Sequence, residues 1–234
     1  MKIVFLTTDS YHHWYFLNFL KLKKIHFNAV ISETEKIIPS FDVEADWEKN
    51  IEIFEKKRWK KMIEVNVSEL QYVKNINNNS SKKILKSLRP DFGIVFGTRK
   101  INKSVISLFR LGLINIHRGI TNEYRGLDCD LWPIYHNDYE NLGVTIHKVD
   151  NDLDTGEIIE QEKVNLTRDF ECYKLRAMTT ELAANLLVEI IRKLKKTQKV
   201  DCSPLKRKGR YYSFMPKCLK IETEKKLIKY LNKK

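Results

Sequence analysis

Three side chains in the middle of this 234-residue chain are of types that can move a proton and stabilise an oxyanion: Asn115, His117 and Asp154. An asparagine amide can donate hydrogen bonds to an oxygen that gains negative charge in a transition state. A histidine can take up and release a proton near neutral pH. A nearby aspartate can hold the histidine in one tautomer or accept a proton itself. These three residues are therefore the candidate catalytic group.

A short strand is expected to hold two of these side chains. If residues 113–117 form a strand, its period of two puts Asn115 and His117 on one face, with Ile114 and Ile116 on the other. Asp154 lies in a glycine-bounded turn at residues 151–156, between stretches of strand character at 143–149 and 158–166. The hypothesis therefore requires distant segments of the chain to meet at one pocket.

The order of apolar runs and amphipathic stretches predicts an α/β fold, a Rossmann-like, mostly parallel twisted sheet flanked by helices. Further strands are expected at residues 2–7, 27–32, 62–67 and 92–96. Helices are expected after residue 10 and at residues 46–61, 82–88, 102–109, 128–135, 170–196 and 220–234, with the helix at 128–135 packed beneath the site. Asp9-Ser10, Ser81 and Asp169 are the expected helix caps.

One loop is a candidate for ligand binding because of its place in such a sheet. Ligands of doubly wound sheets bind outside the carboxyl ends of the strands. Residues 96–101 follow a central strand and contain Gly97. By contrast, residues 7–10 after the first strand contain no glycine, so a dinucleotide-binding fingerprint is absent there.

Composition favours a folded, cytoplasmic protein. Hydrophobic residues make up 42% and aromatic residues 11% of the chain, which is typical of a globular domain. No apolar run approaches the ~20 residues of a membrane span, and the apolar part of the N-terminus is too short for a signal peptide. The four cysteines are scattered without a C-x-x-C pair, which predicts neither a zinc site nor a disulfide framework.

The net charge of +13 raises the alternative of nucleic-acid binding. The basic residues are spread over several segments, however, instead of forming one stripe with interleaved aromatics, so solvated helix faces are favoured. A basic surface also helps to capture an anionic substrate. We expect a catalytic domain over residues 1–197 and a basic extension over residues 198–234. The sequence leaves open whether the chain forms a homodimer.

The motifs around the candidate group resemble those of formyltransferases that use 10-formyltetrahydrofolate, and most closely those that act on nucleotide-linked amino sugars. The resemblance rests on the order of four segments: Asn115-Ile-His117, Tyr124-Arg125-Gly126, Gly143-Val-Thr-Ile-His147 and Leu153-Asp154-Thr-Gly-Glu-Ile-Ile. One departure is that Gly119 stands where the family commonly has serine, and Ile120-Thr121 follow it.

The resemblance implies an N-formyltransferase with 10-formyltetrahydrofolate as co-substrate and no metal. Asn115 would stabilise the tetrahedral oxyanion, His117 would act as base, and Asp154 would orient the imidazole and assist proton transfer. It also implies two sets of binding residues. The folate set is Phe96, Gly97, Thr98, Ile101 and Asp150, and the acceptor set is Tyr124, Arg125 and Gly126. Whether Arg125-Gly126 orients the acceptor or a neighbouring loop stays open.

Among the branches of the family, the resemblance favours a nucleotide-linked amino sugar as acceptor, such as dTDP-4-amino-4,6-dideoxyglucose for O-antigen and lipopolysaccharide synthesis. The glycine-containing phosphate loop of the ribonucleotide branch is absent, and too few residues remain for the large C-terminal domain of the tRNA branch. Two alternatives stay open. One is a formyltetrahydrofolate hydrolase, which would release formate without an acceptor. The other is a basic nucleic-acid-binding protein.

Three further histidines are interpreted as lying outside the catalytic group. His147, on the expected strand at 143–149, is interpreted as structural. His12 and His13 are expected on the surface, near the end of the first strand where an acceptor can bind.

Overall fold

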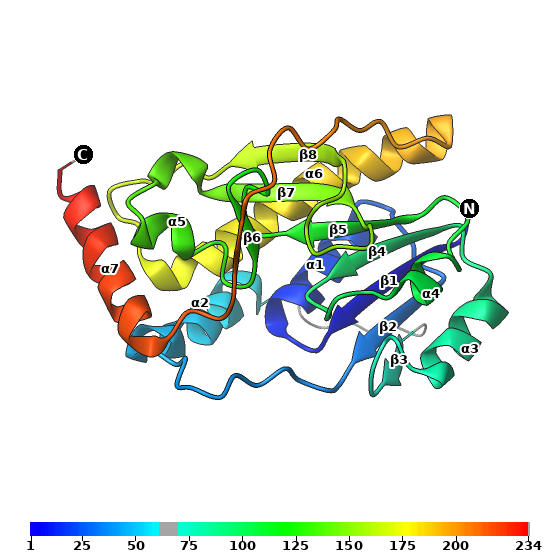
Figure 1. The fold of residues 1–234 in the computed structure, drawn as a ribbon, viewed down its shortest axis with the longest axis horizontal. Helices are drawn as coiled ribbons and strands as arrows, with labels where there is room; N and C mark the ends of the chain where they lie inside the picture. Colours follow the sequence, from blue (N-terminus) through cyan, green and yellow to red (C-terminus); the bar gives the residue numbers. More distant parts are fainter. Residues whose placement is uncertain (61–69, 234) are drawn as a thin grey trace.

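The computed structural model describes residues 1–60 and 70–233, which form a central sheet with helices on both faces (Figure 1). The sheet has seven strands in the order β3-β2-β1-β4-β5-β7-β8. Their bounds are Ile3–Thr8 (β1), Ala29–Glu33 (β2), Leu70–Val73 (β3), Phe92–Phe96 (β4), Leu113–His117 (β5), Gly143–Lys148 (β7) and Ile158–Lys163 (β8). The strand expected at residues 62–67 lies outside the described residues.

The strand pairing confirms a mostly parallel α/β sheet. β1 pairs in parallel with β2 and β4, and β4 pairs in parallel with β5. β7 and β8 then continue the sheet antiparallel to their neighbours. The strands β2 and β4 are buried along their whole length, as expected for parallel strands covered on both faces.

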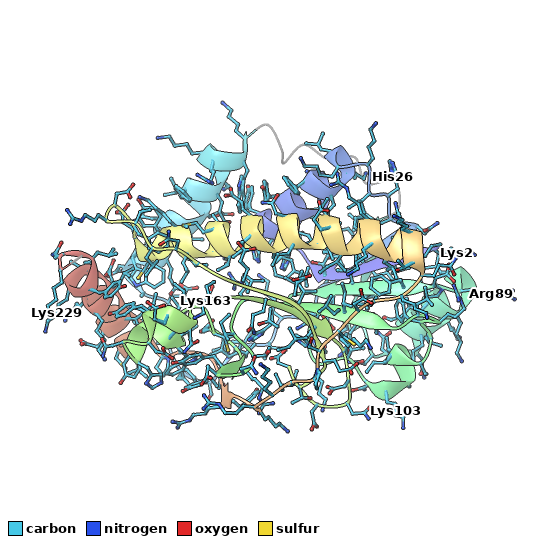
Figure 2. All side chains as sticks on the ribbon, turned by 90° about the horizontal axis from the view of Figure 1, so that it is seen from above. Lys2, His26, Arg89, Lys103, Lys163 and Lys229 are labelled. Atoms are coloured by element: carbon cyan, nitrogen blue, oxygen red, sulfur yellow. The ribbon has the colours of Figure 1, made fainter. Side chains whose placement is uncertain are left out.

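Each face of the sheet is covered by a different pair of helices. α1 (Tyr11–Leu22) and α6 (Leu175–Thr197) pack on one face, and their buried side chains join those of β1, β4, β5 and β7 in the largest core cluster. α3 (Asn79–Leu88) and α4 (Lys103–Ile106) contribute to a second cluster on the opposite face. Figure 2 shows α6 running along one face of the sheet. α2 (Lys49–Trp59) lies against α1 and α6.

Two of the expected helix caps are wrong. The cap of α3 is Asn78, whose side chain accepts the N–H of Ser81 at 2.8 Å, while the Ser81 hydroxyl donates to the Asn75 carbonyl. The long helix α6 begins at Leu175, because a 3₁₀ turn at Cys172–Lys174 precedes it. Asp169 instead accepts a hydrogen bond from Thr167. Of the expected Asp9-Ser10 cap, Ser10 does hold the N-cap position of α1, but its side chain makes no cap hydrogen bond.

The C-terminal segment packs onto the rest of the chain. β9 (Arg210–Tyr212) pairs in parallel with β6 (Tyr124–Gly126), and α7 (Lys217–Leu231) packs against α5 (Trp132–Tyr135). The helix expected at 128–135 is reduced to α5, because Asp128 has a φ of +50°. Trp132 donates to the Ser213 carbonyl and belongs to a third core cluster, together with Met215 and Leu227 of the C-terminal segment. None of the helices in the described ranges is long and apolar enough to cross a membrane.

Candidate active site

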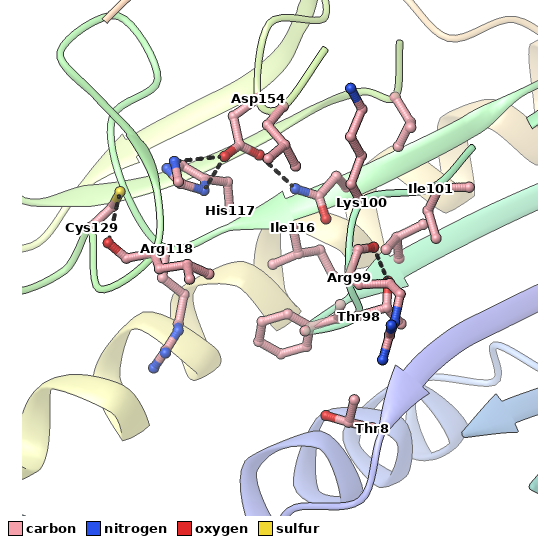
Figure 3. A pocket seen from close by; sticks show the side chains of 18 of the residues that line it. Thr8, Thr98, Arg99, Lys100, Ile101, Ile116, His117, Arg118, Cys129 and Asp154 are labelled. Carbon is pink, nitrogen blue, oxygen red and sulfur yellow. Dashed lines mark hydrogen bonds and ion pairs between the residues drawn. The ribbon is translucent and has the colours of Figure 1, made fainter. Parts of the chain in front are cut away.

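A cavity of about 770 Å³ opens at the carboxyl ends of β1, β4 and β5, where the sequence places the candidate ligand loop. Figure 3 shows its walls: His117 and Asp154 face each other on one side, and Thr98 and Ile101 lie on another. Thr8, at the end of β1, lies below them in that view. A cavity therefore lies at the edge of the sheet where the sequence places the candidate ligand loop.

Asn115 and His117 both line this cavity, while Ile114 and Ile116 belong to the main core cluster and Ile116 also borders the cavity. The alternation expected for β5 is thus confirmed. Antiparallel pairing of β5 with β7 sets His147 directly opposite Asn115. The Asn115 amide lies 3.2 Å from His147 Nε2 and donates to Asp154 Oδ1, also at 3.2 Å. His147 therefore belongs to the group that the sequence limited to three residues.

Asp154 is held at the centre of the group by its own turn. It adopts a φ of +53° and accepts the Gly126 N–H at Oδ2, 2.9 Å away. Asp150 stabilises the same turn by accepting the Thr155 hydroxyl at 2.8 Å. The two oxygens of Asp154 then face two rings, His117 Nδ1 at 3.5 Å and His147 Nε2 at 3.3 Å. The carboxylate is therefore shared by two imidazoles.

The backbone fixes which nitrogen of each imidazole carries a proton in the neutral form. His117 Nε2 lies 3.0 Å from the Tyr124 carbonyl, and His147 Nδ1 lies 2.8 Å from the Lys148 carbonyl. A carbonyl can only accept, so each of these nitrogens must be the N–H donor. The second nitrogen of each ring then presents a lone pair to Asp154. A proton added to either ring forms an ion pair with this carboxylate.

Electrostatics favour an ionised Asp154 beside a neutral His117. Burial raises the pKa of Asp154, but His117, His147 and the Gly126 N–H lower it by more, so this pKa lies well below its usual range. Burial lowers the pKa of His117, and the charge of Asp154 raises it only in part. His117 is thus poised to accept a proton during a reaction.

Gly119 leaves the space that the His117 ring needs. A Cβ at position 119 would lie 2.6 Å from His117 Nε2 and 2.7 Å from the Cβ of Cys129. The departure from the serine of the resembled motif therefore has a steric basis in this chain.

All five residues of the expected folate set line the cavity: Phe96, Gly97, Thr98, Ile101 and Asp150. Ile101 is 4% exposed and belongs to the apolar cluster beneath the loop. Gly97 has a φ of +79°, and a Cβ there would lie 2.4 Å from the His13 ring. Their function as folate ligands stays a prediction.

The three residues of the expected acceptor set are placed differently. Gly126 lines the cavity, whereas Tyr124 and Arg125 are buried and do not border it in the described part of the chain. Arg125 donates to the carbonyls of Gly209 and Leu153, each at 2.7 Å. Arg125 is thus placed to orient the neighbouring loop, and its contact with an acceptor stays a prediction. Contact of Tyr124 with an acceptor stays a prediction.

The expectation that His12 and His13 lie on the surface is wrong. They are 7% and 3% exposed, they line the cavity, and their rings pack against Phe96. Burial lowers the pKa of both, that of His13 to about 3. Tyr211 and Phe214, from the C-terminal segment, also border the cavity and were not anticipated. Within residues 1–60 and 70–233, no cluster of His, Cys, Asp or Glu is placed to hold a metal ion.

An amide, two imidazoles and a carboxylate lie together beside a cavity at the carboxyl edge of an α/β sheet, an arrangement suited to moving a proton and stabilising an oxyanion. Comparison with known proteins identifies the family, because the formyl transferase family model matches residues 1–191. The chain belongs to the formyl transferase family.

Curated relatives and solved structures point to different members of that family. A methionyl-tRNA formyltransferase of Thermotoga maritima is 37% identical over 123 residues, which is 52% of this chain and 39% of the relative. One from Kosmotoga olearia is 27% identical over 202 residues, 83% of this chain and 59% of the relative. The chain thus spans between about two fifths and three fifths of these relatives.

The solved structures share the fold at low identity. A 4-N formyltransferase from Francisella tularensis matches with a TM-score of 0.63 and 18% identity, over 91% of this chain and 76% of its own. A formyltransferase from Anoxybacillus kamchatkensis, PseJ, matches with a TM-score of 0.57 and 20% identity, over 91% and 86%. The latter was solved with UDP-4,6-dideoxy-4-formamido-L-AltNAc and tetrahydrofolate.

Proposed function

We propose that the protein transfers the formyl group of 10-formyltetrahydrofolate to the primary amine of a nucleotide-linked amino sugar, such as dTDP-4-amino-4,6-dideoxyglucose, in surface-polysaccharide synthesis. The observation that carries the proposal is the convergence of Asn115, His117 and Asp154 on one cavity of about 770 Å³. A cavity of this size can take a drug-sized ligand.

In the proposed reaction the acceptor nitrogen attacks the formyl carbon, and a new C–N bond forms as the carbonyl oxygen becomes an oxyanion. The attacking nitrogen loses its proton to His117, whose imidazolium is stabilised by Asp154 at Nδ1. The tetrahedral intermediate then collapses, and the bond between the formyl carbon and N10 of the folate breaks. The proton held by the pair of His117 and Asp154 passes to the departing nitrogen.

Asn115 is the proposed oxyanion donor, and the structure suggests how its amide becomes available. In the free site the Asn115 amide nitrogen contacts both His147 Nε2 and Asp154 Oδ1, each at 3.2 Å. Both distances lie at the long end of the hydrogen-bond range, so the amide can exchange its contact with His147 for one with the reacting oxygen. One amide N–H is then free to donate to the oxyanion.

The loop at residues 96–101 and the turn at residues 150–154 are proposed to hold the folate between them. The loop offers Ile101 as an apolar contact, and the turn offers the Asp150 carboxylate. The acceptor would then approach from the side of His12, Gly126 and Tyr211. Tyr211 is 49% exposed at the cavity, so its ring is open to stack on a nucleotide base.

Support for a sugar acceptor comes from the solved relatives, which include enzymes of this class and match 91% of the chain. Formylation of methionyl-tRNA is the second candidate, favoured by the 37% identity with a methionyl-tRNA formyltransferase and by the net charge of +13. The two candidates share the donor and the catalytic group, so only the acceptor distinguishes them.

One screen tests the proposal. The protein is incubated with 10-formyltetrahydrofolate and, separately, with dTDP-, UDP- and GDP-linked amino sugars and initiator methionyl-tRNA, and products are identified by mass. A formylated amino sugar is the expected product. Formyl-methionyl-tRNA without any formylated sugar overturns the choice of acceptor. Release of formate without any acceptor, and no formylated product, assigns the hydrolase alternative.

A further inference from the structure

The loop between β4 and α4, which is proposed to hold the folate, is itself held from behind by side chains of other segments. Asn77, in the segment between β3 and α3, donates from Nδ2 to the Lys100 carbonyl at 2.9 Å. Its Oδ1 accepts the Asn102 N–H at 2.8 Å. One amide thus satisfies a backbone acceptor and a backbone donor two residues apart, as a neighbouring strand would.

A buried carboxylate at the end of β2 holds the preceding part of the same loop. Glu33 is 3% exposed, and its Oε2 accepts the Arg99 N–H at 3.3 Å. Glu33 Oε1 lies 2.7 Å from Arg99 Nε and accepts the Ile76 N–H at 2.9 Å. The Arg99 guanidinium also donates to the Glu35 carbonyl. The shape of the loop is therefore set by the segment between β3 and α3, which contains Ile76 and Asn77, and by Glu33 at the end of β2.

Two backbone N–H groups of the same loop, which lines the cavity, are left without such partners among the described residues. In the described part of the chain, the N–H groups of Lys100 and Ile101 find no protein acceptor, although Ile101 is buried. Buried backbone groups are rarely left unpaired in native proteins. Some backbone groups of the loop are therefore fixed by other protein segments, and two N–H groups stay available to a ligand.

We propose that Asn77 and Glu33 are positioning residues for the folate: they touch no substrate, and they hold the backbone of residues 99–102 in the shape that binds it. This proposal rests on the proposed function. A loop that is not held must be ordered at the moment of binding, and that ordering lowers affinity. The catalytic group of Asn115, His117 and Asp154 lies on other elements, so loss of the Asn77 hydrogen bonds does not act on it directly.

The test compares Asn77→Leu, which removes both hydrogen bonds at similar volume, with Asn185→Leu on α6 as a matched control. Among the described residues, the Asn185 side chain donates only to the Glu181 carbonyl of its own helix. For each protein, the dissociation constant of tetrahydrofolate is measured by calorimetry, and kcat and KM are measured for 10-formyltetrahydrofolate and for the acceptor found in the screen. Thermal unfolding shows that each variant is folded.

For Asn77→Leu, the dissociation constant and the folate KM are expected to rise by about 10-fold, the effect of losing one or two ordinary hydrogen bonds. The kcat at saturating folate and the acceptor KM should stay within about twofold of wild type, a split that general damage to the fold would not produce. Asn77→Asp keeps the hydrogen bond to Asn102 and loses the one to Lys100. Its dissociation constant for tetrahydrofolate should therefore lie between those of wild type and Asn77→Leu. If Asn77→Leu does not fold, Asn77→Asp and Glu33→Gln are judged by the same criteria.

Two outcomes overturn the inference in different ways. If wild type binds tetrahydrofolate and a folded Asn77 variant binds it equally well, or if kcat falls together with affinity, the positioning role is wrong and the proposed function stands. If wild type does not bind tetrahydrofolate at all, the proposed function fails, and the inference fails with it.

Discussion

Replacing Asp154 by asparagine removes one charge from the centre of the site and hardly changes its volume. The Gly126 N–H, 2.9 Å from Oδ2, requires an acceptor, so the oxygen of the new amide takes the Oδ2 position. Its NH₂ group then points at Asn115, which lies 3.2 Å from Oδ1 in the wild type. Two amide donors face each other there, so the Asn115 side chain has to turn.

The loss of charge acts mainly through His117. Without the carboxylate 3.5 Å from Nδ1, the imidazolium formed during proton transfer loses its stabilising partner. Removal of such support to a general base lowers turnover by about 10²–10⁴-fold. The charge of Asp154 raises the pKa of His117. Its removal therefore lowers that pKa further, and the acidic limb of the profile of kcat/KM against pH moves to lower pH.

Initial rates of formyl transfer with Asp154→Asn, measured across the acidic and neutral range, check both effects. Asp201→Asn is the matched control, because that carboxylate is 71% exposed and, within the part of the chain that the structure describes, its ion pair is with Lys193 on the surface. A folded Asp154→Asn protein that keeps the wild-type kcat would refute the assigned role. An acidic limb that moves to higher pH would contradict the electrostatic argument even if turnover fell.

Three further changes test other parts of the site. His147→Gln removes the ring whose Nε2 lies 3.2 Å from the Asn115 amide. We expect kcat to fall by about 10–100-fold while the folate KM is unchanged. A variant with wild-type kcat would exclude the proposed role of this contact in releasing Asn115. His13 has a folded pKa of about 3 against 6.5 when unfolded. The contribution of the neutral His13 to the free energy of unfolding is complete above pH 6.5. It is lost towards pH 3, by up to ~1.4 kcal/mol per pH unit. In urea titrations, the free energy of unfolding of His13→Gln should therefore depend less on pH than that of wild type. Arg125→Lys cannot reach both the Gly209 and Leu153 carbonyls, so unfolding should become easier by about 1–3 kcal/mol; an unchanged urea midpoint would contradict this.

The features that the sequence predicts well depend on local patterns. Alternation within residues 113–117 is enough to put Asn115 and His117 on one face, because side chains of a strand alternate regardless of its partners. Apolar runs likewise identify β1, β2 and β4 as buried strands of a parallel sheet. Asp154 is predictable only because its turn belongs to a recognisable motif.

The features that the sequence does not predict depend on pairing and packing between distant segments. His147 joins the site because the β5–β7 register sets it opposite Asn115, and a register cannot be deduced from one strand alone. His12 and His13 are buried by contact with Phe96, which comes from another strand. The start of the long helix was misplaced because the Asp169 side chain pairs with Thr167 instead of a helix N–H.

The parallel pairing of β6 with β9 has a consequence for the order of events during synthesis. The Asp154 turn can form while later residues are still being added, but Arg125 receives its Gly209 partner, and the cavity receives Tyr211 and Phe214, only after that segment has left the ribosome. Chains in translation should therefore acquire the sheet before they acquire the complete wall of the cavity. A nascent polypeptide released before residue 209 would hold every proposed proton-transfer group and still leave them open to water.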